Sequence, residues 1–168
     1  MKIKNGRALK WLKAFHILTS SIWFGGVFCI AILAWIAFFQ MDKDSFLIIA
    51  PLVPALYQKV ILPVALITIL QGIIYGFFTN WGFLKNGWIA IKWASVLLIG
   101  LCTGIGSIGQ MFSVIERVQN HSFAGGFADG GMVLLFISLQ LILLAVMICL
   151  SVLKPKKSKL KTAIKIIT

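Results

Sequence analysis

Long apolar stretches separated by short polar segments dominate this chain of 168 residues. A helix of about 20 apolar residues crosses the hydrocarbon core of a bilayer, which is about 30 Å thick. Four stretches reach that length, at residues 11–38, 58–79, 87–112 and 130–154. The pattern predicts an all-α fold, with residues 1–155 as one integral membrane domain in which four transmembrane helices form a bundle.

The segments between these stretches are expected to be connections outside the membrane. The first, residues 40–57, contains Pro51 and Pro54, which interrupt regular helices. Its apolar part, residues 46–50, is expected to lie at the membrane surface. The third connection is expected to cover residues 113–129, where two adjacent glycines favour a loop.

The charges are unevenly distributed. The chain has 16 Lys and Arg but only 4 Asp and Glu, and 60% of its residues are hydrophobic. Five basic residues precede residue 14 and six follow residue 153. Basic residues beside membrane spans mark the cytoplasmic side, so both termini are expected there, in a bacterial cytoplasmic membrane. The basic tail, residues 156–168, is expected to bind anionic lipid headgroups. This placement argues against a nucleic-acid partner.

Small residues in the third stretch predict close contact with another helix, because they let backbones approach where lipid provides no hydrophobic driving force. They fall on two adjacent helical faces, one with Gly100, Gly104 and Ser107, the other with Cys102, Gly106 and Gly109. Whether the bundle also associates with a second copy of itself is left open.

Two ionisable side chains lie clear of the ends of the apolar stretches, His16 and Lys92. Such residues are costly in a membrane and usually have a partner or a function. From the helical rise, both lie about 8 Å inside the cytoplasmic face, with Gln71 at about 12 Å and Met147 at about 10 Å. These four side chains are expected to form one layer of the bundle.

The chemistry of this layer suits haem. A neutral imidazole such as that of His16 binds iron, and His or Met commonly serves as the opposite ligand. Lys92 is a candidate partner of a haem propionate or, when deprotonated, an axial ligand; Met147 and Gln71 are weaker axial candidates. Trp23 shares the face of His16 and is a candidate pocket wall. At the cytoplasmic rim, basic residues are available to haem carboxylates, namely Arg7, Lys10 and Lys13.

A structural role for the same residues remains open. His16 can simply bond a neighbouring helix, and Lys92 can extend to the interface. His121 lies in the third connection, about one membrane thickness from His16, so the two cannot bind one iron. It is either a ligand of a second haem, with Met111 or Met132, or a solvated loop residue.

Several short motifs in this sequence occur together in one known family. They are Lys13-Ala14-Phe15-His16-Ile17, Trp23-Phe24-Gly25-Gly26, Tyr57 with Pro63, Gly87-Trp88 with Lys92, and Lys154-Pro155. In this set the chain resembles the HemJ-type protoporphyrinogen oxidases and the wider CopD-like family of small bacterial membrane proteins. The resemblance implies a four-helix membrane protein that binds haem b, with His16 and Lys92 at the family's first-helix histidine and third-helix lysine.

Three functions follow as expectations. The first is holding haem b in the membrane for sequestration, sensing or electron transfer to a redox partner. The second is protoporphyrinogen oxidation, although the Arg, Asn and Glu that those enzymes carry before their fourth helix are replaced here by residues 123–129, so enzymatic activity is left open. The third is copper handling, because soft sulfur ligands favour Cu(I). The sulfur residues concerned are Met111, Met132, Met147, Cys29, Cys102 and Cys149.

Overall fold

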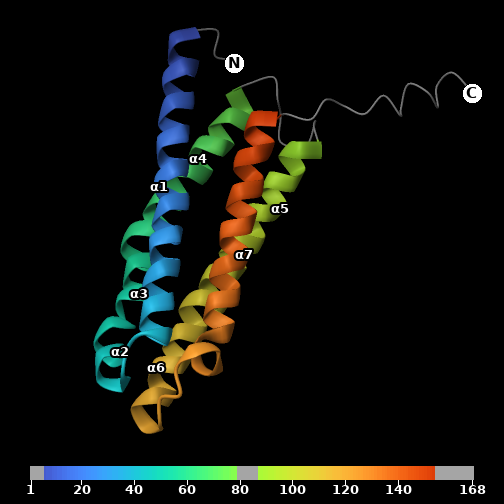
Figure 1. Ribbon diagram of the computed structural model, residues 1–168. Coiled ribbons are helices and arrows are strands. Elements are labelled where there is room, and N and C mark those ends of the chain that lie inside the picture. Colours follow the sequence, from blue (N-terminus) through green and yellow to red (C-terminus); the bar gives the residue numbers. More distant parts are fainter. Residues whose placement is uncertain (1–5, 79–86, 154–168) are drawn as a thin grey trace, which may run out of the picture.

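The computed structural model describes residues 6–78 and 87–153; for residues 78, 87 and 88 it describes the backbone only. Every element in these ranges is a helix (Figure 1). The elements are α1 (Gly6–Phe39), α2 (Lys43–Ile49), α3 (Leu52–Leu56), η1 (Tyr57–Ile61), α4 (Leu62–Phe78), α5 (Gly87–Leu101), η2 (Cys102–Gly109), α6 (Gln110–Asn120) and α7 (Gly126–Leu153). The η elements are π-helical. The predicted basic tail lies outside the described residues.

Four helical segments are long and apolar enough to cross a membrane, as predicted for a multi-pass membrane protein. They are Gly6–Phe39, Lys43–Phe77, Ile89–Asn120 and Gly126–Leu153. The start of α1 and the end of α7 lie at the same end of the bundle, which we call the terminal end (Figure 1). The opposite end, which we call the loop end, holds the connections from α1 to α2 and from α6 to α7.

The first connection is much shorter than predicted. Only residues 40–42 separate α1 from α2, and α2, α3 and η1 lead into α4 as one almost continuous helical segment. Pro51 directly precedes α3 and Pro54 lies in its first turn, where a missing N–H breaks no intrahelical bond. The location of residues 46–50 at the membrane surface stays a prediction; within the bundle, Phe46 and Ala50 are fully buried.

The third connection is also shorter than predicted, because α6 continues to Asn120 and only residues 121–125 lie between the helices. One Asp129 oxygen accepts hydrogen bonds from the backbone N–H groups of Ala124 (2.8 Å) and Gly125 (2.9 Å), and the other pairs with Arg117 at 3.0 Å. Gly125 has a φ of +69°, which a residue with a side chain rarely adopts. The turn is therefore fixed by Asp129 and by glycine.

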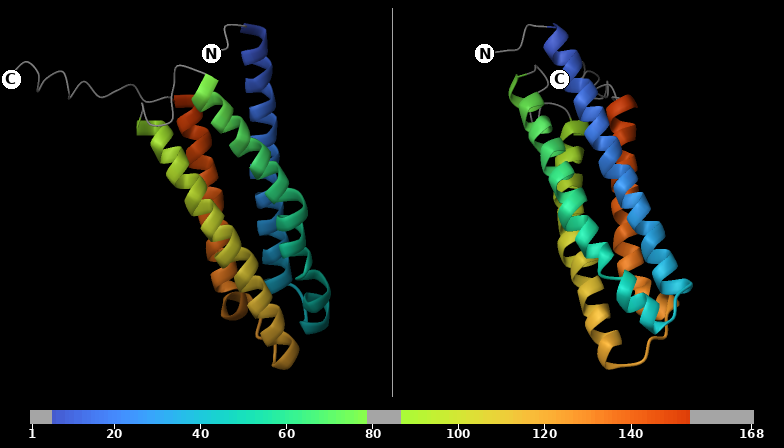
Figure 2. Two further views of the ribbon diagram at one scale, coloured as in Figure 1. Left: turned by 180° about the vertical axis from the view of Figure 1, so that it is seen from behind. Right: turned by 90° about the vertical axis from the view of Figure 1, so that its left-hand side faces the viewer.

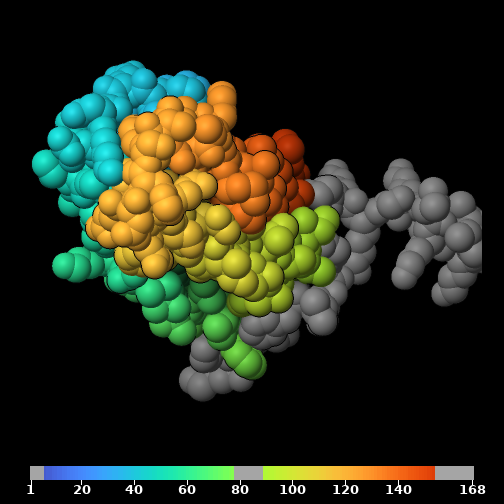
Figure 3. Space-filling view, turned by 90° about the horizontal axis from the view of Figure 1, so that it is seen from below, coloured from blue at the N-terminus to red at the C-terminus, as the bar shows by residue number. Residues whose placement is uncertain are grey.

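The bundle is centred on α1 and α7, which pack against each other; α4 packs on α1, and η2 packs on α7. Two further views show these neighbours (Figure 2). The loop end is closed by α2, α6 and the first turns of α7, which lie side by side when seen from that end (Figure 3). In contrast, the described parts of α4 and α5 form no extensive interface with each other.

Small residues from both predicted faces of the third span are buried: Cys102 and Gly106 from one face, and Ser107, which accepts a hydrogen bond from Gln140 on α7, from the other. A Cβ atom at Gly106 would lie 2.4 Å from the Phe136 ring, so only glycine fits there. Cys102 is buried too, whereas Gly100 and Gly104 are exposed and a Cβ atom on either would meet nothing within 4 Å. Cys102, Gly106 and Ser107 therefore belong to the buried side of this span, and Gly100 and Gly104 do not.

Candidate functional site

His16 lies on α1 in the half of the bundle nearer the terminal end, with its side chain half-buried. Its Nδ1 is 3.1 Å from Oε1 of Gln71 on α4. A carbonyl oxygen can only accept a hydrogen bond, so this contact requires a proton on Nδ1, and in the neutral imidazole Nε2 then has the lone pair. No described residue forms a hydrogen bond with that Nε2 atom.

Gln71 is held from a second direction by Thr19, whose hydroxyl lies 3.1 Å from the same Oε1 atom and 3.2 Å from the backbone oxygen of His16. Gln71 is only 4% exposed. Its Nε2 is buried and has no hydrogen-bond partner among the described residues. A buried polar group without a partner costs about 1–3 kcal/mol, so this amide needs an explanation.

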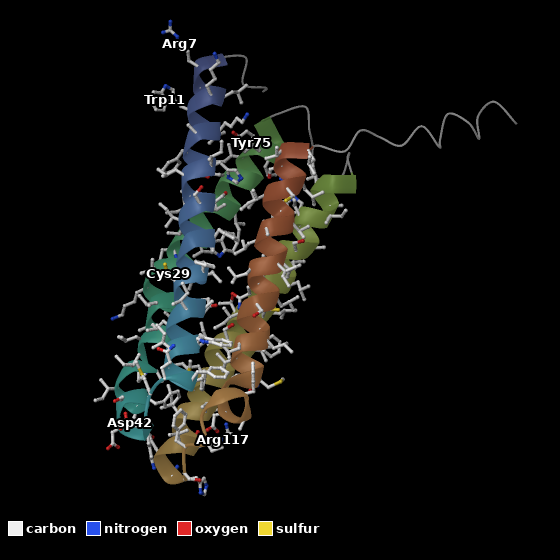
Figure 4. All side chains as sticks on the ribbon, in the orientation of Figure 1. Arg7, Trp11, Cys29, Asp42, Tyr75 and Arg117 are labelled. Atoms are coloured by element: carbon white, nitrogen blue, oxygen red, sulfur yellow. The ribbon has the colours of Figure 1, made fainter. Side chains whose placement is uncertain are left out.

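Two further residues surround the imidazole. The Tyr75 ring, one turn after Gln71 on α4, meets the His16 ring edge-on with 5.8 Å between centroids. In Figure 4 Tyr75 lies towards the terminal end, the end where Arg7 and Trp11 also lie. Lys92 on α5 is near enough for its charge to act on His16. The site thus draws side chains from three of the four spans.

Lys92 itself is held against α7. Its Nζ donates to the Ser151 hydroxyl at 2.5 Å, and that hydroxyl donates to the backbone oxygen of Met147 at 2.8 Å. The four residues expected in one layer therefore form two pairs. His16 of α1 contacts Gln71 of α4 directly, whereas Lys92 of α5 is linked to the Met147 backbone of α7 through the Ser151 hydroxyl. Sequence reasoning missed Thr19, Tyr75 and Ser151.

The remaining candidate residues around His16 lie as follows. Trp23 is buried in the core, on the same side of α1 as Thr19. Arg7 and Lys13 are exposed near the start of α1. Phe15, the residue before His16, is 51% exposed on the outer surface. The basic rim is thus accessible, while Phe15 is not part of the interior.

His121 is exposed at the loop end, directly after α6, and its backbone oxygen accepts a hydrogen bond from Lys43 at 2.9 Å. Figure 4 shows Asp42 and Arg117 at this same end.

The sulfur residues considered as metal ligands do not lie together. Of the methionines considered as partners of His121, Met111 is fully buried and Met132 is 54% exposed. Cys29 and Cys149 are exposed and Cys102 is buried. The described residues contain no cluster of three or more His, Cys, Asp or Glu side chains suited to a metal ion.

A second polar cluster lies in the middle of the bundle and was not anticipated. Oε1 of Gln140 on α7 accepts hydrogen bonds from the hydroxyls of Tyr57 (3.3 Å) and Thr103 (3.1 Å), and its Nε2 donates to Ser107 at 2.6 Å. Tyr57 begins η1, while Thr103 and Ser107 lie in η2. Since the amide bonds on both sides, this cluster is internally satisfied and serves to join helices.

The comparisons with known proteins identify no relative: no protein-family model, curated protein or solved structure matches this chain.

Proposed function

We propose that this chain is a haem b-binding protein of the bacterial cytoplasmic membrane, with both termini in the cytoplasm, and that Nε2 of His16 binds the iron. The observation that carries the proposal is the state of the imidazole. Nδ1 is engaged by a protein oxygen and Nε2 has no described hydrogen-bond partner. Histidines that ligate metals have this arrangement, in which a second protein group orients the ring.

The surroundings of His16 support a flat apolar ligand. The observed hydrogen bonds in this half of the bundle join α1 to α4 and α5 to α7, and α4 and α5 share no extensive interface in the described ranges. A macrocycle that entered between α4 and α5 would therefore break none of these bonds. Bound haem supplies reversible one-electron chemistry at its iron.

The basic residues have a separate role in this proposal. Lys92 donates a hydrogen bond to Ser151 on α7, and in its ordinary protonated form a lysine amine suits a haem propionate better than an axial position. Arg7 and Lys13 are exposed nearer the terminal end and extend the same positive rim. Gln71 already accepts two hydrogen bonds through Oε1, so we assign it to His16 and leave Met147 as the axial candidate on α7.

The absorption spectrum tests the iron ligand. The chain is purified in detergent and titrated with haemin; the wild type should develop a Soret band, and His16→Ala should lose it or bind at least about tenfold more weakly. His121→Ala is the matched control and should behave as the wild type. Added imidazole should restore the band in His16→Gly. An unchanged spectrum in His16→Ala would remove His16 as the ligand.

A complementation experiment separates haem holding from catalysis. Holding haem for sequestration, sensing or electron transfer requires no substrate site. Expression in a strain that lacks its own protoporphyrinogen oxidase should therefore not restore growth. Restored growth that depends on His16 would replace this proposal with the oxidase.

A further inference from the structure

The contact between Gln71 and His16 also determines which ring nitrogen is available to a ligand. We propose that Gln71 is a positioning residue that fixes the tautomer of His16, with the proton on Nδ1 and the lone pair on Nε2. Oε1 of Gln71 lies 3.1 Å from Nδ1. Because that oxygen has no proton to donate, the contact is a hydrogen bond only when Nδ1 is protonated.

Thr19 stabilises this orientation of the amide. Its hydroxyl donates to the same Oε1 atom at 3.1 Å, and Thr19 is itself buried one turn from His16 on α1. Two donors from α1 thus converge on one acceptor from α4. The oxygen end of the amide is held towards α1.

The opposite orientation of the amide would select the other tautomer. With the amide turned by 180°, Nε2 of Gln71 would donate to Nδ1 of His16, and the Thr19 oxygen could accept from the same group. The imidazole proton would then be on Nε2, where it blocks a metal. The observed orientation leaves the Gln71 amide nitrogen buried without a described partner and exposes the lone pair instead. The two orientations of one amide are therefore a ligand-competent and a ligand-blocked state.

The tautomer can be measured without haem, because the chain has only two histidines. In a His121→Ala background, protein labelled with ¹⁵N-histidine has a single imidazole, observed by solid-state NMR in bilayers at about pH 8, where an ordinary imidazole is neutral. We expect a protonated Nδ1 and an unprotonated Nε2. Gln71→Met, which keeps the length but removes the acceptor, should move most of the signal to the Nε2-protonated form.

A buried threonine three residues before Gln71 provides the matched control. Thr68 bonds its own helix at Val64, so Thr68→Val should leave the tautomer unchanged. A wild type protonated mainly on Nε2, or a Gln71→Met variant with the wild-type spectrum, would overturn the inference.

The effect on iron binding rests on the proposed function. Gln71→Met should weaken haemin binding by roughly 10–100-fold, the usual effect of losing such a partner, and Thr19→Val should weaken it less. If the wild type binds no haemin, the proposed function fails while the NMR result stands. If Gln71→Met changes neither tautomer nor affinity while His16 still binds haemin, this inference alone fails.

Discussion

At the scale of single residues, Gln140 joins three elements through one amide. It bonds Tyr57 of η1 and both Thr103 and Ser107 of η2, and its side chain is fully buried. Hydrogen bonds between membrane helices contribute about 0.6 kcal/mol each on average. Gln140→Leu, which removes three such bonds at similar volume, should therefore lower the free energy of unfolding in bicelles by about 2 kcal/mol, measured by steric trapping.

Gln119 provides the control, because it is exposed on α6. Gln119→Leu should change the free energy of unfolding by less than about 0.5 kcal/mol, as surface substitutions usually do. If Gln140→Leu were as stable as the wild type, the central cluster would have no structural role, and its polar groups would need another explanation.

Some of these residues could be found from the sequence and others could not. His16 and Gln71 are conspicuous in apolar stretches, and counting helical rise places them within about 4 Å of the same depth. Thr19 and Ser151 give no such signal, because a hydroxyl in a helix can bond its own backbone at no distinctive spacing. The partners Tyr57 and Gln140 lie 83 positions apart, and only the tertiary fold brings them together.

At the scale of elements, the interface between η2 and α7 depends on a missing side chain. A Cβ atom at Gly106 would overlap Phe136, whose Cβ would be 2.8 Å away, so the contact cannot be relieved by the end of a flexible chain. Gly106→Ala should therefore separate the helices and lower the free energy of unfolding by roughly 1–3 kcal/mol, the usual cost of overpacking.

Gly104→Ala is a closely matched control. It lies in the same element, and an added Cβ would meet nothing within 4 Å. Both substitutions change the helix propensity equally, so their difference in the same unfolding assay reports packing alone. Equal stabilities for the two variants would show that η2 does not rely on close approach at Gly106.

The lengths of the elements were harder to predict than their number. Hydropathy indicates four spans because a bilayer requires continuous apolar segments. It does not indicate that Pro51 and Pro54 fall at a helix start, where proline is tolerated. Nor does it indicate that Phe46 is covered by Phe38 of α1 and by Phe123 of the connection between α6 and α7. The π-helical segments likewise have no sequence signature in this chain.

At the scale of the whole molecule, the two ends of the bundle differ in charge and in construction. The loop end carries all four acidic residues of the chain, at the start of α2, in α6 and in the first turn of α7. It is tied together by the Arg117–Asp129 ion pair and by the bond from Lys43 to the His121 backbone. The candidate haem site lies in the other half, where α1 begins and α7 ends.

This asymmetry makes the orientation in the membrane testable. Eleven basic residues flank the first and last spans at the chain ends, and such residues are retained in the cytoplasm. A green fluorescent protein fused after residue 168 should therefore fluoresce, whereas alkaline phosphatase inserted between His121 and Gly125 should be active, because it folds only outside. Exchanging the two reporters should abolish both signals. The reverse pattern would place His16 near the outer leaflet, and haem would then have to reach the site from outside the cell.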